Sequence, residues 1–169
     1  QKAATGCETG LGVLVALLET IIDRLADILE RTGRDVDRLS RTVFKRGGAK
    51  PTPARDFQKV LEEIGRDGDQ TSNIRDSLVT FERMAGYLAQ VITQRKVSED
   101  VQERVRTLSH DIRSLSDHSG FLNQKITFLL DATLGMVSIE QNAIIKIFSV
   151  MAVVFLPPTL IASVYGRNF

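Results

Sequence analysis

The sequence predicts an all-α protein: a long antiparallel helical hairpin, then a long stalk helix that continues into one transmembrane helix. Three observations predict this architecture. Apolar residues recur every three or four positions through three long stretches, which is the period of amphipathic helices. A segment rich in glycine and proline, residues 46–53, separates the first two stretches, and the third ends in an uncharged apolar run, residues 147–165. We therefore expect a cytoplasmic hairpin over residues 1–97, a stalk over residues 98–146 and a membrane helix over residues 147–169.

The composition excludes several classes of protein. The chain has 169 residues, with 22 Lys and Arg against 21 Asp and Glu, so its formal net charge is +1. A dedicated nucleic-acid-binding protein usually has a clear basic excess, so we expect no nucleic-acid partner. Cys7 is the single cysteine, which excludes an intrachain disulfide framework and a multi-cysteine zinc site.

The hairpin consists of two amphipathic stretches, residues 10–45 and residues 53–95. Two Gly and two Pro within residues 46–53 cannot continue a helix, so they predict the turn between antiparallel helices. The expected apolar face of the first helix comprises Leu14, Leu18, Ile21, Leu25, Ile28 and Leu29. The expected apolar face of the second comprises Phe57, Val60, Leu61, Ile64, Leu78, Phe81 and Leu88.

The third helix is predicted to start at Ser98. Serine is a favourable N-cap, and Glu99 and Asp100 complement the helix dipole in the first turn. From there a 3.5-residue repeat, typical of a long helix that packs along a partner, continues for about five heptads. Its positions are Val101, Val105, Leu108, Ile112, Leu115, Ser119, Leu122, Ile126, Leu129, Thr133 and Met136.

The uncharged run, residues 147–165, favours a membrane span. Nineteen residues of helix rise about 28 Å, close to the hydrocarbon thickness of a bilayer. The alternative is a buried helix of a soluble helical hairpin. Lys and Arg recur through the preceding region, so we expect the hairpin and stalk to lie in the cytoplasm.

Polar residues in the run and next to its ends follow one side of the helix. They are spaced by three and four residues together with small and apolar ones, and the whole set is Asn142, Ile145, Ser149, Ala152, Leu156, Thr159, Ser163 and Gly166. Polar groups in a membrane helix face a water-filled path or another helix, so both a pore lining and a helix-packing face stay open on the residues alone.

Neither catalytic nor zinc-binding chemistry is indicated elsewhere. His110 and His118 are eight residues apart, too far for a helical pair of zinc ligands, and we expect both on the helix surface. Neither a phosphate-binding glycine loop nor a nucleophile and base pair is visible, so we expect no enzyme.

The C-terminal third resembles the CorA family of divalent-cation channels. Residues 121–135 read FLNQKITFLLDATLG, residues 139–150 read IEQNAIIKIFSV, and residues 155–169 read FLPPTLIASVYGRNF. Several independent motifs thus occur in the family's order over about 50 residues. The earlier helices match more loosely, best at residues 15–24, which read VALLETIIDR.

The resemblance implies a subunit of a homopentameric magnesium channel, with cobalt, nickel and zinc as ions moved by branches of the family. Magnesium sheds its water reluctantly, so neutral oxygens suit such a path. The family's Gly-Met-Asn signature corresponds to Gly166, Arg167 and Asn168, preceded by Tyr165. By the resemblance, Asn168 forms the entry ring. The implied constriction comprises Ile145, Phe148 and Leu156.

The resemblance also implies a regulatory metal site that involves Asp131 and a carboxylate of a neighbouring subunit. The alternative for Asp131 is a solvated surface acid.

Three features distinguish this chain from the family pattern. The family's N-terminal α/β domain and second membrane helix are not present, which indicates a fragment. Arg167 replaces the signature methionine. Five such charges near an entrance repel a dication unless the side chains point outward to lipid headgroups. The alternative function is a membrane-anchored coiled-coil scaffold without transport.

Overall fold

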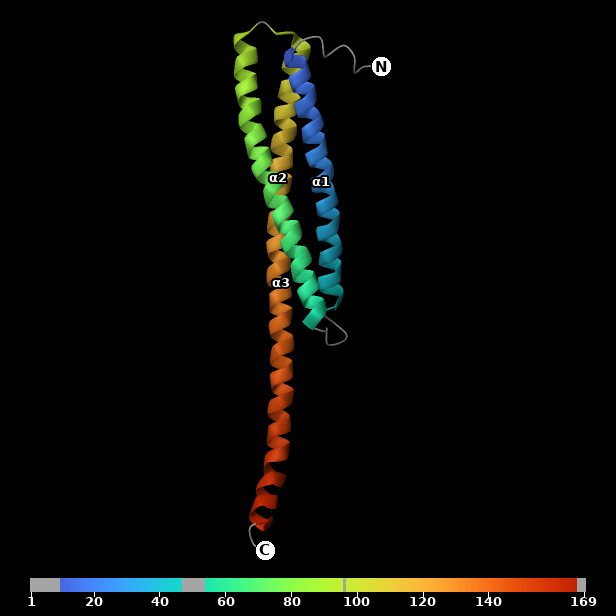
Figure 1. Cartoon of the computed structure of the whole chain (residues 1–169), viewed down its shortest axis with the longest axis vertical. Helices are drawn as coiled ribbons and strands as arrows, with labels where there is room; N and C mark the ends of the chain where they lie inside the picture. The colour runs from blue at the N-terminus through green and yellow to red at the C-terminus, as the bar shows by residue number, and fades with distance from the viewer. Residues whose placement is uncertain (1–9, 47–53, 96, 167–169) are drawn as a thin grey trace.

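The protein is an all-α molecule of three long helices, described by a computed structural model over residues 10–46, 54–95 and 97–166. The helices are α1 (Gly10–Arg46), α2 (Ala54–Gln94) and α3 (Glu99–Gly166). Figure 1 shows α1 and α2 as an antiparallel hairpin beside the first half of α3, while the second half of α3 extends alone. The predicted all-α class is confirmed, and the starts of all three helices and the ends of the first two lie within about one residue of those expected.

The 3.5-residue repeat predicted for α3 forms the face, or seam, by which α3 packs in the bundle. The side chains at nine of the eleven positions of the 3.5-residue repeat are buried: Val101, Val105, Leu108, Ile112, Ser119, Leu122, Ile126, Leu129 and Thr133. Leu115 and Met136 are half-buried and pack against the same core. The partners of this seam are α1 and α2 of the same chain. The repeat is therefore occupied within one molecule, and does not by itself require a second chain.

At two positions of α1, the buried residue is the one that directly follows the predicted residue. Leu14 and Ile21 are 39% and 42% exposed, whereas their neighbours Val15 and Ile22 are 0% and 3% exposed. Apolar residues stand at both members of each pair, so the spacing pattern does not decide which member faces inward. Contact with α2 and α3 decides it.

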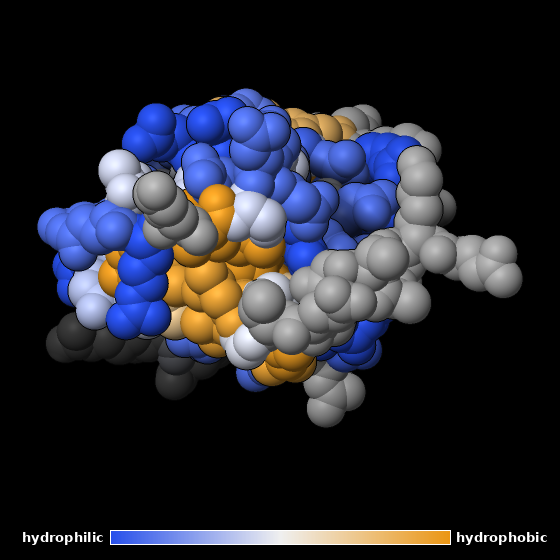
Figure 2. All heavy atoms as spheres, turned by 90° about the horizontal axis from the view of Figure 1, so that it is seen from above, coloured by the Kyte–Doolittle hydropathy of each residue, from blue (hydrophilic) through white to orange (hydrophobic). Residues whose placement is uncertain are grey.

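The bundle contains two apolar clusters along its length. The first is shared by all three helices and includes Leu29, Leu78 and Ile112, which are almost fully buried. The second lies nearer the free end of α3 and comprises Val36, Leu39, Val43, Val60, Ile64, Ile126 and Leu129. Seen from above in Figure 2, apolar side chains gather inside a largely hydrophilic outer surface.

Gly68 on α2 faces Ile126 on α3. A Cβ placed at Gly68 lies 3.5 Å from the Ile126 side chain, an ordinary van der Waals distance, so the packing of the two helices here does not require a glycine. Burial of the two clusters is the main favourable contribution to packing, at about 25 cal/mol per Å² of apolar surface.

Ion pairs connect α1 to α3 at two levels. Arg104 donates from Nε and Nη2 to the two carboxylate oxygens of Glu19, at 2.9 Å and 2.6 Å. Lys125 donates to the Asp37 carboxylate, and this hydrogen bond is the main reason that the pKa of Asp37 lies below its ordinary value. Both pairs fix the same relative register of α1 and α3.

We expect the forked Arg104–Glu19 pair to contribute a coupling free energy of about 0.5–1 kcal/mol to folding. Its side chains are 23% and 35% exposed, so water screens it incompletely. A double-mutant cycle on the alanine variants, followed by urea unfolding, measures this coupling. The matched control is the Arg106–Glu103 pair on α3, whose side chains are 75% and 66% exposed. Equal coupling in the two cycles would contradict the expectation.

Candidate functional site

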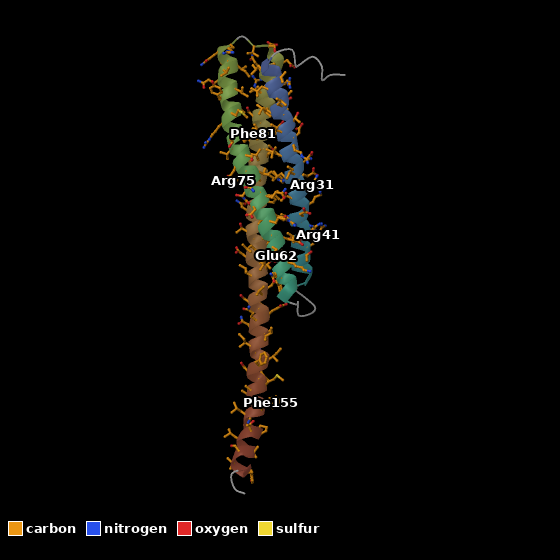
Figure 3. All side chains as sticks on the ribbon, in the orientation of Figure 1. Arg31, Arg41, Glu62, Arg75, Phe81 and Phe155 are labelled. Carbon is orange, nitrogen blue, oxygen red and sulfur yellow. The ribbon has the colours of Figure 1, made fainter. Side chains whose placement is uncertain are left out.

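The free half of α3 carries the candidate site. Its large apolar side chains from Ile139 to Tyr165 are between 49% and 73% exposed. Figure 3 places Phe155 on this free part, well away from Arg31 and Arg41 on the bundle. Among the described residues, α3 is the one helix long and apolar enough to cross a membrane, and none of its most apolar window is buried. An apolar surface of this size in water is strongly unfavourable, so it calls for lipid or partner chains around it.

The predicted polar stripe lies along one side of this helix. Because α3 runs without a break to Gly166, positions spaced by three and four residues stay on one side, with a drift of about 20° per heptad. The members of the stripe in the described chain are all exposed: Asn142, Ile145, Ser149, Ala152, Leu156, Thr159, Ser163 and Gly166. Phe148, also exposed, flanks them. Arg167 and Asn168 lie outside the described residues.

The hydroxyl groups of the stripe are satisfied by their own helix. Ser149 donates to the Ile145 carbonyl at 2.9 Å, and Thr159 donates to the Phe155 carbonyl at 2.8 Å. Ser163 likewise donates to the Leu160 carbonyl at 3.1 Å. Each hydroxyl has thus used its one donor and keeps oxygen lone pairs as acceptors. The stripe therefore presents neutral oxygen acceptors, the groups that can receive hydrogen bonds from the water around a hydrated cation.

Two prolines lie inside the free part of α3 and leave backbone acceptors unused. Helix α3 continues through Pro157 and Pro158, neither of which has an N–H group. The carbonyls four residues earlier, at Val153 and Val154, therefore lack their usual helical donor. Such groups within an apolar run need water, a side chain or a neighbouring helix as a partner.

Asp131 is exposed on α3, between the packed bundle and the apolar run. Among the described residues, no group of three or more His, Cys, Asp or Glu side chains is arranged to hold a metal ion. The regulatory site expected at Asp131 therefore stays a prediction, with any further ligands coming from outside the described part of the chain.

Both histidines lie on the surface, as expected. The His110 side chain is 83% exposed, with Nδ1 3.6 Å from an oxygen of Asp111. His118 is exposed and stacks on Phe121, with ring centroids 6.5 Å apart.

Sequence reasoning missed Asp67, a carboxyl group buried within the bundle. Its side chain is 2% exposed, and Oδ2 has no hydrogen-bond partner among the described residues. The signal was present, because Asp67 continues the three-and-four spacing of Val60, Ile64, Thr71 and Ile74 along α2.

The fold and site together define a class of protein, a helical bundle with one long helix that extends beyond it. The extended part of that helix is apolar and exposed, and neutral polar groups lie along one of its sides. Comparison with known sequences identifies the family. The chain belongs to the family described as CorA-like Mg2+ transporter protein, whose model matches residues 4–169. The resemblance noted from the sequence is thereby confirmed.

Similar proteins include three bacterial relatives named Magnesium transport protein CorA. The relative from Pasteurella multocida is 39% identical over 157 residues, which is 93% of this chain and 47% of that protein. The relatives from Haemophilus influenzae and Salmonella typhimurium are 38% and 39% identical, with the same shares covered. The chain thus spans about half the length of the curated relatives it matches.

Proposed function

We propose that this chain is part of a channel subunit that carries Mg2+ across a cell membrane, the inner membrane where a cell has two. Residues 147–169 form its first membrane helix, residues 98–146 its stalk and residues 1–97 a hairpin in the cytoplasm. The observation that carries the proposal is the uncharged, unburied half of α3, joined without a break to a packed bundle. Membership of the CorA-like family supports magnesium as the ion.

The polar stripe supplies chemistry that suits a hydrated cation. Mg2+ keeps several of its waters, because dehydrating it is unfavourable. Neutral oxygens of Asn142, Thr159 and Asn168 accept hydrogen bonds from that water without holding the ion as tightly as carboxylates do. Between them, rings of Ile145, Phe148 and Leu156 close the path by excluding water.

A ring of copies is needed to enclose the path, since one helix has no interior. We propose a homopentamer for the full-length protein, with the polar stripe of each copy toward the shared axis. Lipid then covers the remaining apolar surface. The alternative scaffold function is weaker, because the 3.5-residue repeat of α3 already packs against α1 and α2 of its own chain.

Ion flux through full-length protein in liposomes tests the proposal. We expect protein-dependent entry of Mg2+ that is driven by the membrane potential, with Co2+, Ni2+ and Zn2+ compared in parallel. A pentamer in detergent supports the arrangement around an axis. Absence of flux for all four ions, together with a dimer or trimer in detergent, would favour the scaffold instead.

A regulatory role for Asp131 is part of the proposal. An ion held between Asp131 and a carboxylate of a neighbouring subunit keeps adjacent stalks together, and its loss lets the carboxylates repel each other. Ion binding is then coupled to the conformation of the stalks, as expected when one state binds the ligand more tightly.

We expect Arg167→Met to leave Mg2+ flux unchanged in the full-length protein. The expectation follows if Arg167 points outward, where a guanidinium reaches lipid headgroups and lies away from the path. Inward-facing charges would repel Mg2+, since two charges 4 Å apart near a protein surface interact by about 4 kcal/mol. Isotope uptake into liposomes measures the flux. A rise of about tenfold or more in Arg167→Met would place the charge in the path, because a tenfold rate change corresponds to about 1.4 kcal/mol.

A further inference from the structure

A layer of polar side chains divides the core of the bundle. Thr32 on α1, Asp67 on α2 and Ser119 on α3 are all 2% exposed or less. On α1 and α2 the layer lies between the two apolar clusters, and Leu29 and Ile74 belong to the first cluster. On α3 the boundary between the clusters falls about one turn beyond Ser119, between Leu122 and Ile126. The second cluster lies toward the free end of α3 and includes Val36, Ile64 and Ile126.

The hydroxyl groups of the layer are satisfied, whereas the carboxyl group is not. Thr32 donates to the Ile28 carbonyl at 3.0 Å. Thr71, which is fully buried one turn beyond Asp67 on α2, donates to the Asp67 carbonyl at 2.7 Å. Ser119 donates across the interface to the Thr71 carbonyl at 3.3 Å. With these donors used, Oδ2 of Asp67 has no hydrogen-bond partner among the described residues. A buried carboxylate with one oxygen unpaired, and the other 3.7 Å from a largely exposed Arg66 guanidinium, is less favourable than a buried neutral carboxyl group.

The charged groups on α1 and α2 do not neutralise Asp67. Burial raises the pKa of Asp67 above its ordinary value. Arg66, with Nε 3.7 Å from Oδ1, lowers the pKa, while the carboxylates of Asp35 on α1 and Glu63 on α2 raise it. The Arg66 side chain is itself 65% exposed, so water weakens its effect.

Helix α3 offers no free cation at this level within the described chain. Two residues of α3 that contact this part of α2 are uncharged: Ser119 bonds to Thr71, and Ile126 lies beside Gly68. Lys125 is charged but binds Asp37 on α1. His118 is exposed and stacks on Phe121.

We propose that Asp67 is a proton-dependent joint between the hairpin and α3. With its proton, the carboxyl group fits the layer and the two apolar clusters pack as one continuous bundle. Without it, the bundle opens at the layer and the second cluster, nearest the free half of α3, separates from the first. This inference concerns packing of the bundle alone and does not depend on the proposed function.

The sign of the pH dependence follows from proton linkage. The closed bundle holds the Asp67 proton more tightly than the open form, in which water reaches the carboxyl group. Raising the pH from the pKa of the open form toward that of the closed form therefore favours opening. One linked proton increases the opening equilibrium by up to about tenfold per pH unit in this interval.

Hydrogen exchange on full-length protein in detergent tests the joint. Wild type and Asp67→Asn are compared at each of a series of values from about pH 4, near the ordinary pKa of an aspartate, to about pH 8, so that the chemical exchange rate cancels between them. The carboxamide that replaces the Asp67 carboxyl group does not titrate in this pH range. We expect exchange of α2 and α3 amides near the layer to rise more steeply with pH in wild type than in Asp67→Asn. Amides near Leu88 and Val105, deep in the first cluster, should show no such difference.

Asp69→Asn is the matched control, because Asp69 lies two residues further along α2 and is exposed. It makes the same change of charge and should retain the wild-type pH dependence. Asp67→Ser provides a second variant without a titrating group, should Asp67→Asn fail to fold. Equal pH dependence in wild type and the Asp67 variants would overturn the proposal, as would loss of the pH dependence in Asp69→Asn.

Discussion

Ile112→Ala is expected to lower the free energy of unfolding by about 2–5 kcal/mol, the range for removing a large aliphatic side chain from a packed core. The Ile112 side chain is 1% exposed and belongs to the first apolar cluster, to which all three helices contribute. Truncation removes buried apolar surface and leaves a cavity. The three packed helices can move only slightly, so they fill the cavity only in part. Urea unfolding of the chain in detergent, followed by circular dichroism, measures the change.

Ile139→Ala is the control for this effect. It makes the same chemical change on the same helix, at a side chain that is 70% exposed. We expect a change within about 0.5 kcal/mol there, as for most surface substitutions. If the two variants lose similar free energy, then α3 is not held by the packing described for its first half.

The sequence predicted α3 better than α1, and the reason is physical. The 3.5-residue repeat of α3 continues over eleven positions, so Ser119 and Thr133 were placed in the core by spacing, even though apolar neighbours stand beside some repeat positions, as at Phe121 and Leu122. In α1, apolar residues stand side by side at 14 and 15 and again at 21 and 22. Either member of each pair could face inward on periodicity, and packing against two other helices selects Val15 and Ile22.

The candidate site was predictable in part. Absence of charge and the helical period are properties of the sequence, so the free half of α3 and its polar stripe could be found before the structure. Asp67 was not found, because aspartates are mostly exposed in folded proteins, although its place in the three-and-four spacing of Val60, Ile64, Thr71 and Ile74 put it on the packed face. What the polar stripe faces in an assembly depends on neighbouring copies, which no single-chain pattern determines.

Asn168→Leu is expected to reduce Mg2+ flux through the full-length protein by at least about tenfold, which corresponds to a loss of about 1.4 kcal/mol. Under the proposed function, the carboxamide oxygens of Asn168 receive hydrogen bonds from the water around the ion at the entry. Hydrogen bonds to charged groups contribute about 1.5–3 kcal/mol each, and hydrogen bonds from water polarised by a dication belong to the same range. Leucine keeps a similar size but offers no oxygen, so the hydrated ion loses these acceptors in every subunit at once.

The matched control is Asn73→Leu, which makes the same change at an exposed position on α2, within the bundle and outside the free half of α3. The Mg2+ flux through the Asn73→Leu variant should equal that through wild type. The amount of folded oligomer should be the same for wild type, Asn168→Leu and Asn73→Leu. Uptake of Mg2+ into liposomes, normalised to that amount, measures the effect. Wild-type flux in Asn168→Leu would show that the ion does not depend on this carboxamide. A smaller amount of folded oligomer would also lower the flux. Only a lower flux from an equal amount of oligomer therefore supports a ring of Asn168 side chains at the entry.

Asn142→Leu then extends the test to the other end of the same stripe, where a matching decrease in Mg2+ flux is expected if one continuous path connects the two amides.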